Sequence, residues 1–205
     1  MKILLHACCA PCLIYPYSRL KDQGNEVTAF FYNPNIHPFR EYKKRFETLK
    51  IYAENFNFPL VYDKKYELID FLRKIVFHEA ERCSICYSTR LERTALLAKD
   101  QGFEAFTTTL LFSKYQRHDL VTSLCNTISL RYNIPFIYED FRAGWHLGMD
   151  IAKELDMYCQ SYCGCIYSEQ ERYDKSIKML ASTNDKLKIH RDTNYVHNVS
   201  DCHQK

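Results

Sequence analysis

Residues 3–12 read ILLHACCAPC. Ile3, Leu4 and Leu5 form a short continuous apolar run, which is typical of a strand that is buried on both faces of a parallel sheet. Two cysteines follow the run, and Pro11 suits the first turn of a helix. The stretch therefore predicts the strand, turn and helix with which an α/β fold begins.

The rest of the chain repeats this alternation of strand and helix. Apolar runs predict further strands at residues 27–32, 60–62, 105–107 and 136–138. Apolar residues at helical spacing predict helices near residues 11–23, 42–56, 68–75, 87–98, 121–132 and 147–155, and from 168 onward. We therefore expect a Rossmann-like, doubly wound parallel sheet of about five strands, followed by a C-terminal helical portion.

This fold is expected to occupy residues 1–181 as a single α/β domain, because residues 182–205 are polar, lack periodicity and predict a weakly ordered tail. The last helix is expected to begin at Ser168, where Glu171 completes a capping box. The buried faces of the last two helices are expected to carry Leu147, Ile151, Leu155, Tyr173, Ile177 and Leu180.

Composition limits the class of protein. A chain of 205 residues, 46% of them hydrophobic, can bury a full core in one domain. No apolar run approaches the ~20 residues of a membrane span, and the N-terminal apolar segment is too short for a secretory signal. We therefore expect a cytoplasmic protein without a membrane partner. The balance of 28 basic against 25 acidic residues neither requires nor excludes a nucleic-acid partner.

Unusual residues follow four of the predicted strands. They are Cys8 and Cys9, then residues 33–37, 107–109 and 140–142. In open α/β sheets, ligands bind in the crevice outside the carboxyl ends of the strands. We therefore expect these segments to meet at a common binding crevice.

The ten cysteines favour metal binding or redox chemistry, because a reducing compartment does not sustain structural disulfides. Cys83 and Cys86 are three residues apart, so at the start of a helix their side chains project to one side. With Cys8 and Cys9 they make a set of four thiolates that suits either a structural zinc ion or an iron-sulfur cluster. Their place at the ligand-binding edge favours a working cluster.

Cys163 and Cys165 differ from that set, because a single intervening residue makes a poor bite for one metal ion. A turn through Gly164 permits a small disulfide, which would be easily reduced and suits an electron relay. Two ordinary half-buried thiols fit the spacing equally well. Cys125 is expected in the core, and Cys12 near the four thiolates but not needed as a ligand.

Two cysteine positions are weaker candidates. Cys159 is expected to neighbour the pair at 163 and 165. Cys202, with His197 and His203, resembles a metal cluster only faintly and is interpreted as part of the tail.

Six motifs together resemble those of one known family. They are LLHACCAPC (4–12), YNPNIHPFREYKKR (32–45), CSICY (83–87), FTTTLLFSKYQ (106–116), YEDFRAG (138–144) and YCGCIYSEQER (162–172). With these the chain resembles the cobalamin-independent epoxyqueuosine reductases of the QueH type. Lys114 stands where a proline is usual in that family, and Cys159 where a basic residue is usual.

The resemblance implies a Rossmann-like fold, a [4Fe-4S] cluster and tRNA as substrate, and it leaves open an additional iron and the identity of the electron donor. It implies the last step of queuosine biosynthesis, in which the epoxide of the modified wobble base is reduced to an alkene. It assigns the cluster to Cys8, Cys9, Cys83 and Cys86, and the redox-active pair to Cys163 and Cys165.

Further residues are candidates for contact with the substrate. Asp140, after the fifth predicted strand, is a candidate catalytic proton donor, and Arg142 and His37 are candidates for phosphate or base contacts. The basic run Arg40, Lys43, Lys44 and Arg45 is a candidate for anticodon-stem phosphates, although a solvated helix face explains it equally well.

Two other functions fit parts of the sequence. An ATP-dependent tRNA-thiolating enzyme uses a similar sheet, but it needs a glycine-rich phosphate loop, and residues 8–12 contain no glycine. A zinc-stabilised RNA-binding module without catalysis fits the cysteines, and metal analysis distinguishes it from the reductase.

Overall fold

Four parallel strands form the sheet of the computed structural model, which describes residues 1–63, 65–174 and 176. The strand order is β3-β2-β1-β4. The strands are β1 (Lys2–His6), β2 (Glu26–Phe31), β3 (Leu60–Tyr62) and β4 (Ala105–Thr108). Leu4 of β1 pairs with Thr28 on one side and with Phe106 on the other. This central position explains the apolar run of residues 3–5, which is fully buried.

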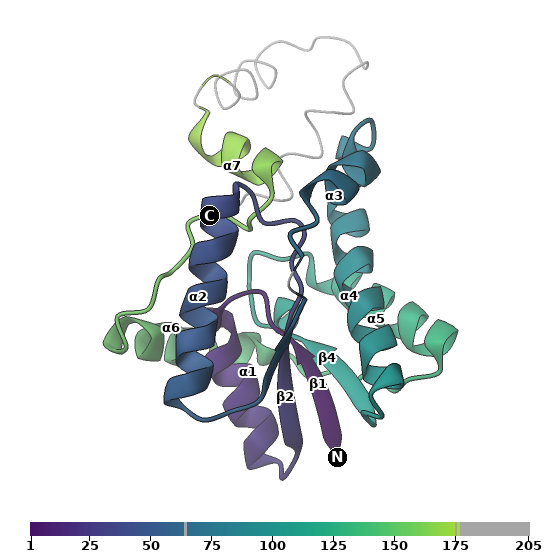
Figure 1. Cartoon of the computed structure of the whole chain (residues 1–205), viewed down its shortest axis with the longest axis vertical. Helices are drawn as coiled ribbons and strands as arrows, with labels where there is room; N and C mark the ends of the chain where they lie inside the picture. The colour runs from purple at the N-terminus through teal and green to yellow at the C-terminus, as the bar shows by residue number, and fades with distance from the viewer. Residues whose placement is uncertain (64, 175, 177–205) are drawn as a thin grey trace.

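Helices cover both faces of the sheet, as expected for a doubly wound fold (Figure 1). One group consists of α1 (Ala10–Asp22), α2 (Phe39–Asn55) and α6 (Trp145–Glu154), and the other of α3 (Leu68–Ile75), α4 (Arg82–Asp100) and α5 (His118–Tyr132). The short helix α7 (Ile166–Tyr173) lies beyond the carboxyl ends of the strands. The 3-10 turns are η1 (Glu79–Glu81), η2 (Thr109–Leu111) and η3 (Phe141–Gly144).

The predicted fifth strand at residues 136–138 does not form. Phe136 makes only an isolated parallel bridge to Phe106. The preceding Pro135 has no N–H to donate, and Tyr138 is 52% exposed, so the ladder ends after a single bridge. The α/β architecture is confirmed, with four strands among the described residues instead of about five.

Helix α6 buries only part of the predicted face, because only Ile151 of that face packs against the core. Leu147 and Leu155 are 57% and 42% exposed, whereas Gly148 and Ala152 are buried. A Cβ added at Gly148 would lie 2.9 Å from the Phe112 ring, so this helix packs through its small residues. Apolar spacing alone cannot detect such close packing.

Helix α7 also differs from expectation. It begins at Ile166 instead of Ser168, and Glu171 forms a buried ion pair with Arg82 instead of a capping box. Tyr173 is 52% exposed instead of buried. Ile177, Leu180 and the predicted tail at 182–205 lie outside the described residues. Within the described part, no helix has the length and apolar character that a membrane span requires.

Candidate functional site

A cavity of about 640 Å³ lies beyond the carboxyl ends of the strands. Its wall takes residues from the start of α1, the segment after β2, the start of α4 and the segment after β4. The cysteines that line it are Cys12, Cys83, Cys86, Cys159, Cys163 and Cys165. Thiols from three distant parts of the chain therefore share one cavity. Of the four segments predicted to meet at a common crevice, only residues 33–37 contribute to its wall, through Asn35.

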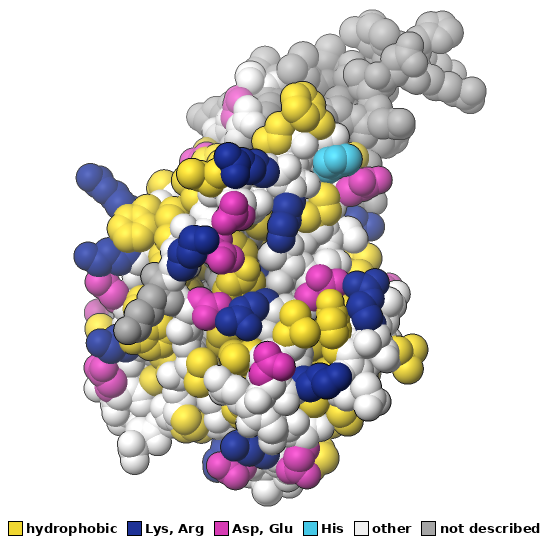
Figure 2. Space-filling model, turned by 45° about the vertical axis from the view of Figure 1, so that its right-hand side comes forward, with side chains coloured by type: hydrophobic (Ala, Val, Ile, Leu, Met, Phe, Trp, Pro, Cys, Tyr) yellow, Lys and Arg dark blue, Asp and Glu magenta, His cyan; other side chains and the backbone are white. Residues whose placement is uncertain are grey.

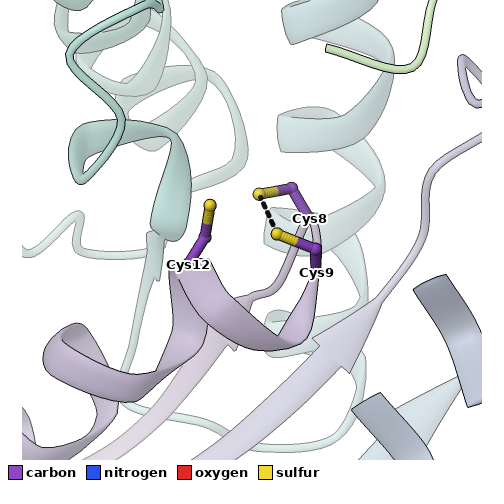
Figure 3. Close-up of side chains that lie close together, drawn as sticks. All are labelled: Cys8, Cys9 and Cys12. Carbon is purple, nitrogen blue, oxygen red and sulfur yellow. Dashed lines mark hydrogen bonds between the residues drawn. The ribbon is translucent and has the colours of Figure 1, made fainter. Parts of the chain in front are cut away.

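Cys8 and Cys9 lie in the turn between β1 and α1, next to Cys12 (Figure 3). The three sulfur atoms lie within 4.8 Å of one another, and those of Cys8 and Cys9 are 3.7 Å apart. Because the chain leaves the strand after His6, two adjacent cysteines can turn their sulfurs toward each other. The triad is able to bind a metal.

Neighbouring donors favour a thiolate at Cys8. Hydrogen bonds from Cys12 and Cys9 hold the pKa of Cys8 well below its usual range, and Thr109 Oγ1 donates a third at 3.3 Å. Burial raises the pKa of Cys9, so the charge resides on one sulfur of the triad. The backbone N–H of Cys8 in turn donates to Thr109 Oγ1 at 3.1 Å, which joins the ends of β1 and β4.

Arg90 brings a positive charge into the same region. It is 3% exposed, and it donates to the Cys86 carbonyl at 3.3 Å and to Asn33 Oδ1 at 3.4 Å. Among the described residues no carboxylate forms an ion pair with it. Burial works against its charge, yet the nearby Cys86 and Cys8 side chains hold the pKa of Arg90 above its usual value. Nearby negative charge stabilises a buried cation of this kind, and the Cys8 thiolate supplies such a charge.

The pair Cys163 and Cys165 lies on a tightly held turn. Gly164 has φ +114°, and its carbonyl accepts a hydrogen bond from the His37 N–H at 2.7 Å. Arg45 donates to the carbonyls of Tyr162 at 3.0 Å and of Cys163 at 3.1 Å. Cys163 is exposed, whereas Cys165 is 7% exposed and burial raises its pKa. The turn therefore presents one accessible and one buried thiol.

Comparison with known proteins identifies the family. The family described as epoxyqueuosine reductase QueH matches residues 3–171. The epoxyqueuosine reductase QueH of Dehalococcoides mccartyi is 36% identical over 174 residues, which cover 85% of this chain and 96% of that protein. The protein of the same name from Thermotoga maritima is 36% identical over 184 residues, which cover 84% and 93%. The chain belongs to the epoxyqueuosine reductase QueH family.

A solved structure shows a weaker likeness. The crystal structure of a predicted subunit of a tRNA methyltransferase from Methanocaldococcus jannaschii aligns with a TM-score of 0.48 at 18% identity, over 74% of this chain and 75% of that one. This similarity is too low to bear on the function of a QueH family member.

Two of the predicted contact residues in this QueH family member are buried. Arg45 is 2% exposed and pairs with Glu41 at 2.7 Å, and His37 is 3% exposed and contacts the rings of Tyr66 and Phe71. Neither reaches solvent, so their burial contradicts the predicted contact of Arg45 with RNA phosphates and of His37 with a phosphate or a base. The remainder of the basic run, Arg40, Lys43 and Lys44, is exposed. On the face drawn in Figure 2, basic and acidic side chains alternate without a broad basic patch.

Asp140 and Arg142 lie outside the cavity wall, at η3. Arg142 donates to both carboxylate oxygens of Asp140, at 2.8 and 2.6 Å. These bonds lower the pKa of Asp140 to about 2, so its carboxyl group is ionised at neutral pH. This geometry gives no support to Asp140 as a proton donor.

Gln160 is a site residue that the sequence does not reveal. Its Nε2 lies 2.9 Å from Cys9 Sγ and 3.8 Å from Cys12 Sγ. The residue precedes the YCGC motif and looks like an ordinary loop amide in the sequence. Its contacts connect the segment that carries the Cys163 turn to the triad of the QueH site.

Proposed function

We propose that this chain reduces epoxyqueuosine to queuosine at the wobble position of tRNA, the last step of queuosine biosynthesis. One observation carries the proposal: thiols from the start of α1, the start of α4 and the segment before α7 line a single cavity, and Cys8 and Cys9 lie next to Cys12 of that wall. Removal of an epoxide oxygen to leave an alkene consumes two electrons and two protons and releases water. Family membership supports the same reaction, because the relatives are named for it.

The thiol set fits an iron-sulfur cofactor. Held by Cys8, Cys9, Cys83 and Cys86, a [4Fe-4S] cluster would supply single electrons, and the Lewis acid for the epoxide oxygen would have to be a separate iron with an open coordination site. A cluster with four thiolates is anionic, and Arg90 is the buried cation that such a charge requires. The triad with Cys12 fits a second possibility, a single ion, because tetrahedral Zn–S bonds of about 2.3 Å place sulfurs roughly 3.8 Å apart. An additional iron beside the cluster remains part of the proposal.

The chain itself supplies a two-electron store. When Cys163 and Cys165 form a disulfide they release two electrons and two protons, which balance the reduction of the epoxide. Buried Cys165 faces the same cavity as Cys86, and exposed Cys163 is accessible to an external reductant. An electron donor of the dithiol or reduced-protein class would restore the pair by thiol–disulfide exchange or electron transfer.

The substrate reaches these groups as a single base. The wobble base lies in a single-stranded loop, and enzymes that act on a base take it out of its stack into a pocket. A volume of about 640 Å³ is within the range of small-molecule sites. The cavity therefore needs to admit only one nucleotide of the RNA and not a double-stranded segment.

Metal analysis and an activity assay test the proposal. After anaerobic purification and reconstitution, we expect iron with acid-labile sulfide, and conversion of tRNA-bound epoxyqueuosine to queuosine by nucleoside mass spectrometry. One zinc ion without visible absorbance and without turnover would instead support the RNA-binding module. Sulfur incorporation that depends on ATP would support the thiolating enzyme.

A further inference from the structure

Part of the cavity wall is aromatic. Tyr115 and Trp145 both line it, and their ring centroids are 5.5 Å apart at an interplanar angle of 88°. Trp145 also packs on Phe112, with centroids 5.1 Å apart. Phe112 is fully buried and does not line the cavity, so it supports the indole from behind.

The position of the indole is fixed by close packing beneath it. A Cβ at Gly144, directly before Trp145, would lie 2.2 Å from the Tyr15 ring, and a Cβ at Gly148 would lie 2.9 Å from Phe112. The start of α6 therefore sits against these rings at a distance that only glycine allows. A wall fixed in this way loses little entropy when a planar ligand stacks on it.

A cation lies beside the two rings. Lys114 Nζ is 5.4 Å from the Trp145 ring centroid and 5.6 Å from that of Tyr115. The Lys114 side chain is exposed, so the ammonium group is available to an incoming phosphate.

Two buried oxygen atoms in the wall lack partners. Asn35 Oδ1 and Gln160 Oε1 have no hydrogen bond within the described part of the chain, and both residues line the cavity. Asn35 is 1% exposed. Buried acceptors left unpaired are costly, so a ligand that brings N–H or O–H donors is favoured here.

We propose that Trp145 forms the stacking platform for a nucleobase of a single-stranded RNA loop, and that Tyr115, perpendicular to the indole, contacts the edge of that base. Lys114 binds a phosphate beside the base, and Asn35 and Gln160 accept hydrogen bonds from its donor groups. The inference rests on the proposed function and adds the way in which the base is held. Stacking on aromatic side chains is the general way in which unpaired bases are bound.

Trp145 is the single tryptophan of the 205-residue chain, so its emission reports on this wall alone. The reconstituted protein is titrated with an anticodon stem-loop RNA, and with the same RNA lacking the wobble base, while binding is followed separately by anisotropy. We expect the complete loop, and not the abasic one, to quench the emission. Equal responses of the emission to bound complete and abasic loops would overturn the platform.

Substitutions distinguish the contribution of stacking to RNA binding from the contribution of charge. Trp145→Leu should weaken binding of the complete loop about 10- to 100-fold, and Trp145→Phe should retain most of the affinity. Lys114→Met should reduce the slope of log K against log salt by about one, because one phosphate contact is lost. The control Lys99→Met, at the end of α4, should leave that slope unchanged. Unchanged affinity in Trp145→Leu and an unchanged slope in Lys114→Met would each contradict the assignment.

The two proposals fail in different ways. Without the reductase function, wild-type protein would yield no queuosine from tRNA carrying the epoxide. With the function intact but the platform wrong, turnover would persist while bound RNA left the Trp145 emission unaffected. Thermal melts of each variant verify that it folds, and the emission titration of the wild-type protein keeps the test valid if the Leu variant does not fold.

Discussion

Arg45 donates a hydrogen bond from Nη1 to the main-chain carbonyl of Cys163 at 3.1 Å, across 118 residues of sequence. Its Nη2 binds the neighbouring Tyr162 carbonyl, and its Nε pairs with Glu41. Glu41 accepts a further hydrogen bond from Tyr158 at 2.6 Å. A single buried guanidinium thus connects α2 to the turn that carries the proposed redox pair.

Replacing Arg45 tests this connection. Arg45→Met leaves the Glu41 carboxylate, with its side chain 10% exposed, without its ion partner, and we expect the free energy of unfolding to fall by about 3–5 kcal/mol. The double variant Arg45→Met/Glu41→Gln should recover part of the loss, because no buried charge remains unpaired. Urea denaturation measures both.

A matched control is available in Arg93, whose ion pair with Asp63 is about one-third exposed. Arg93→Met should cost at most about 1 kcal/mol. If Arg45→Met were no more destabilising than this control, the buried connection would contribute little.

Gly164→Ala probes the turn between the two thiols. Its φ of +114° is accessible to glycine alone, and an added Cβ would lie 2.9 Å from Ile36 Cγ1, so the turn must change shape. We expect the thiol–disulfide equilibrium of Cys163 and Cys165 to shift and turnover to fall, with the bound iron unchanged. Equilibration with glutathione buffers, followed by thiol alkylation, measures the shift.

Gly24→Ala is the control for backbone strain alone. Gly24 also has a positive φ, +80°, but an added Cβ there meets nothing within 4 Å. It should lower stability by about 1–2 kcal/mol and leave the redox equilibrium unchanged. A similar redox shift in both variants would show that general destabilisation, and not the turn, is the cause.

The order of strands and helices was predictable because local patterns determine it. The apolar run at residues 3–5 and the helical spacing that leads into α4 required no tertiary information. The fifth strand was not predictable, because whether a segment joins a sheet depends on its neighbour, and Phe136 pairs at one point only.

Site residues of rare and chemically distinctive types could be predicted from the sequence, whereas site residues of common types could not. Paired cysteines stand out, and those at 83, 86, 163 and 165 do line the cavity. Arg45 was misread because it belongs to a basic run. Its position four residues before Leu49, with Ala53 four further on, places it on the buried stripe of α2, and this was the overlooked signal.

Cysteine substitutions distinguish the two metal sites that the geometry permits. If the cluster uses Cys8, Cys9, Cys83 and Cys86, then Cys12→Ala should keep its iron and sulfide, whereas Cys86→Ala should lose most of both. The opposite pattern would indicate that the compact triad with Cys12 holds the metal. Iron and acid-labile sulfide analysis of anaerobically reconstituted variants provides the measurement.

Asp140→Asn tests whether that carboxyl group takes part in catalysis. Asp140 is 42% exposed in its ion pair with Arg142 and lies outside the cavity wall, so we expect turnover within about twofold of wild type and a stability change of at most about 1 kcal/mol. A drop in kcat of tenfold or more, with normal iron content, would instead support a role of Asp140 as proton donor.

Burial of His37 should make the free energy of unfolding depend on pH. This side chain is 3% exposed, and burial lowers its pKa from 6.5 to about 4, against a smaller opposing effect of the Pro34 backbone. Below about pH 6.5 the unfolded chain binds a proton that the folded protein does not take up until about pH 4, so stability falls over this interval. From about pH 7 to pH 5 this residue should account for a loss of about 2 kcal/mol. Urea denaturation at both pH values should give a smaller loss for His37→Gln than for wild type, and equal losses would show that His37 is protonated in the folded protein.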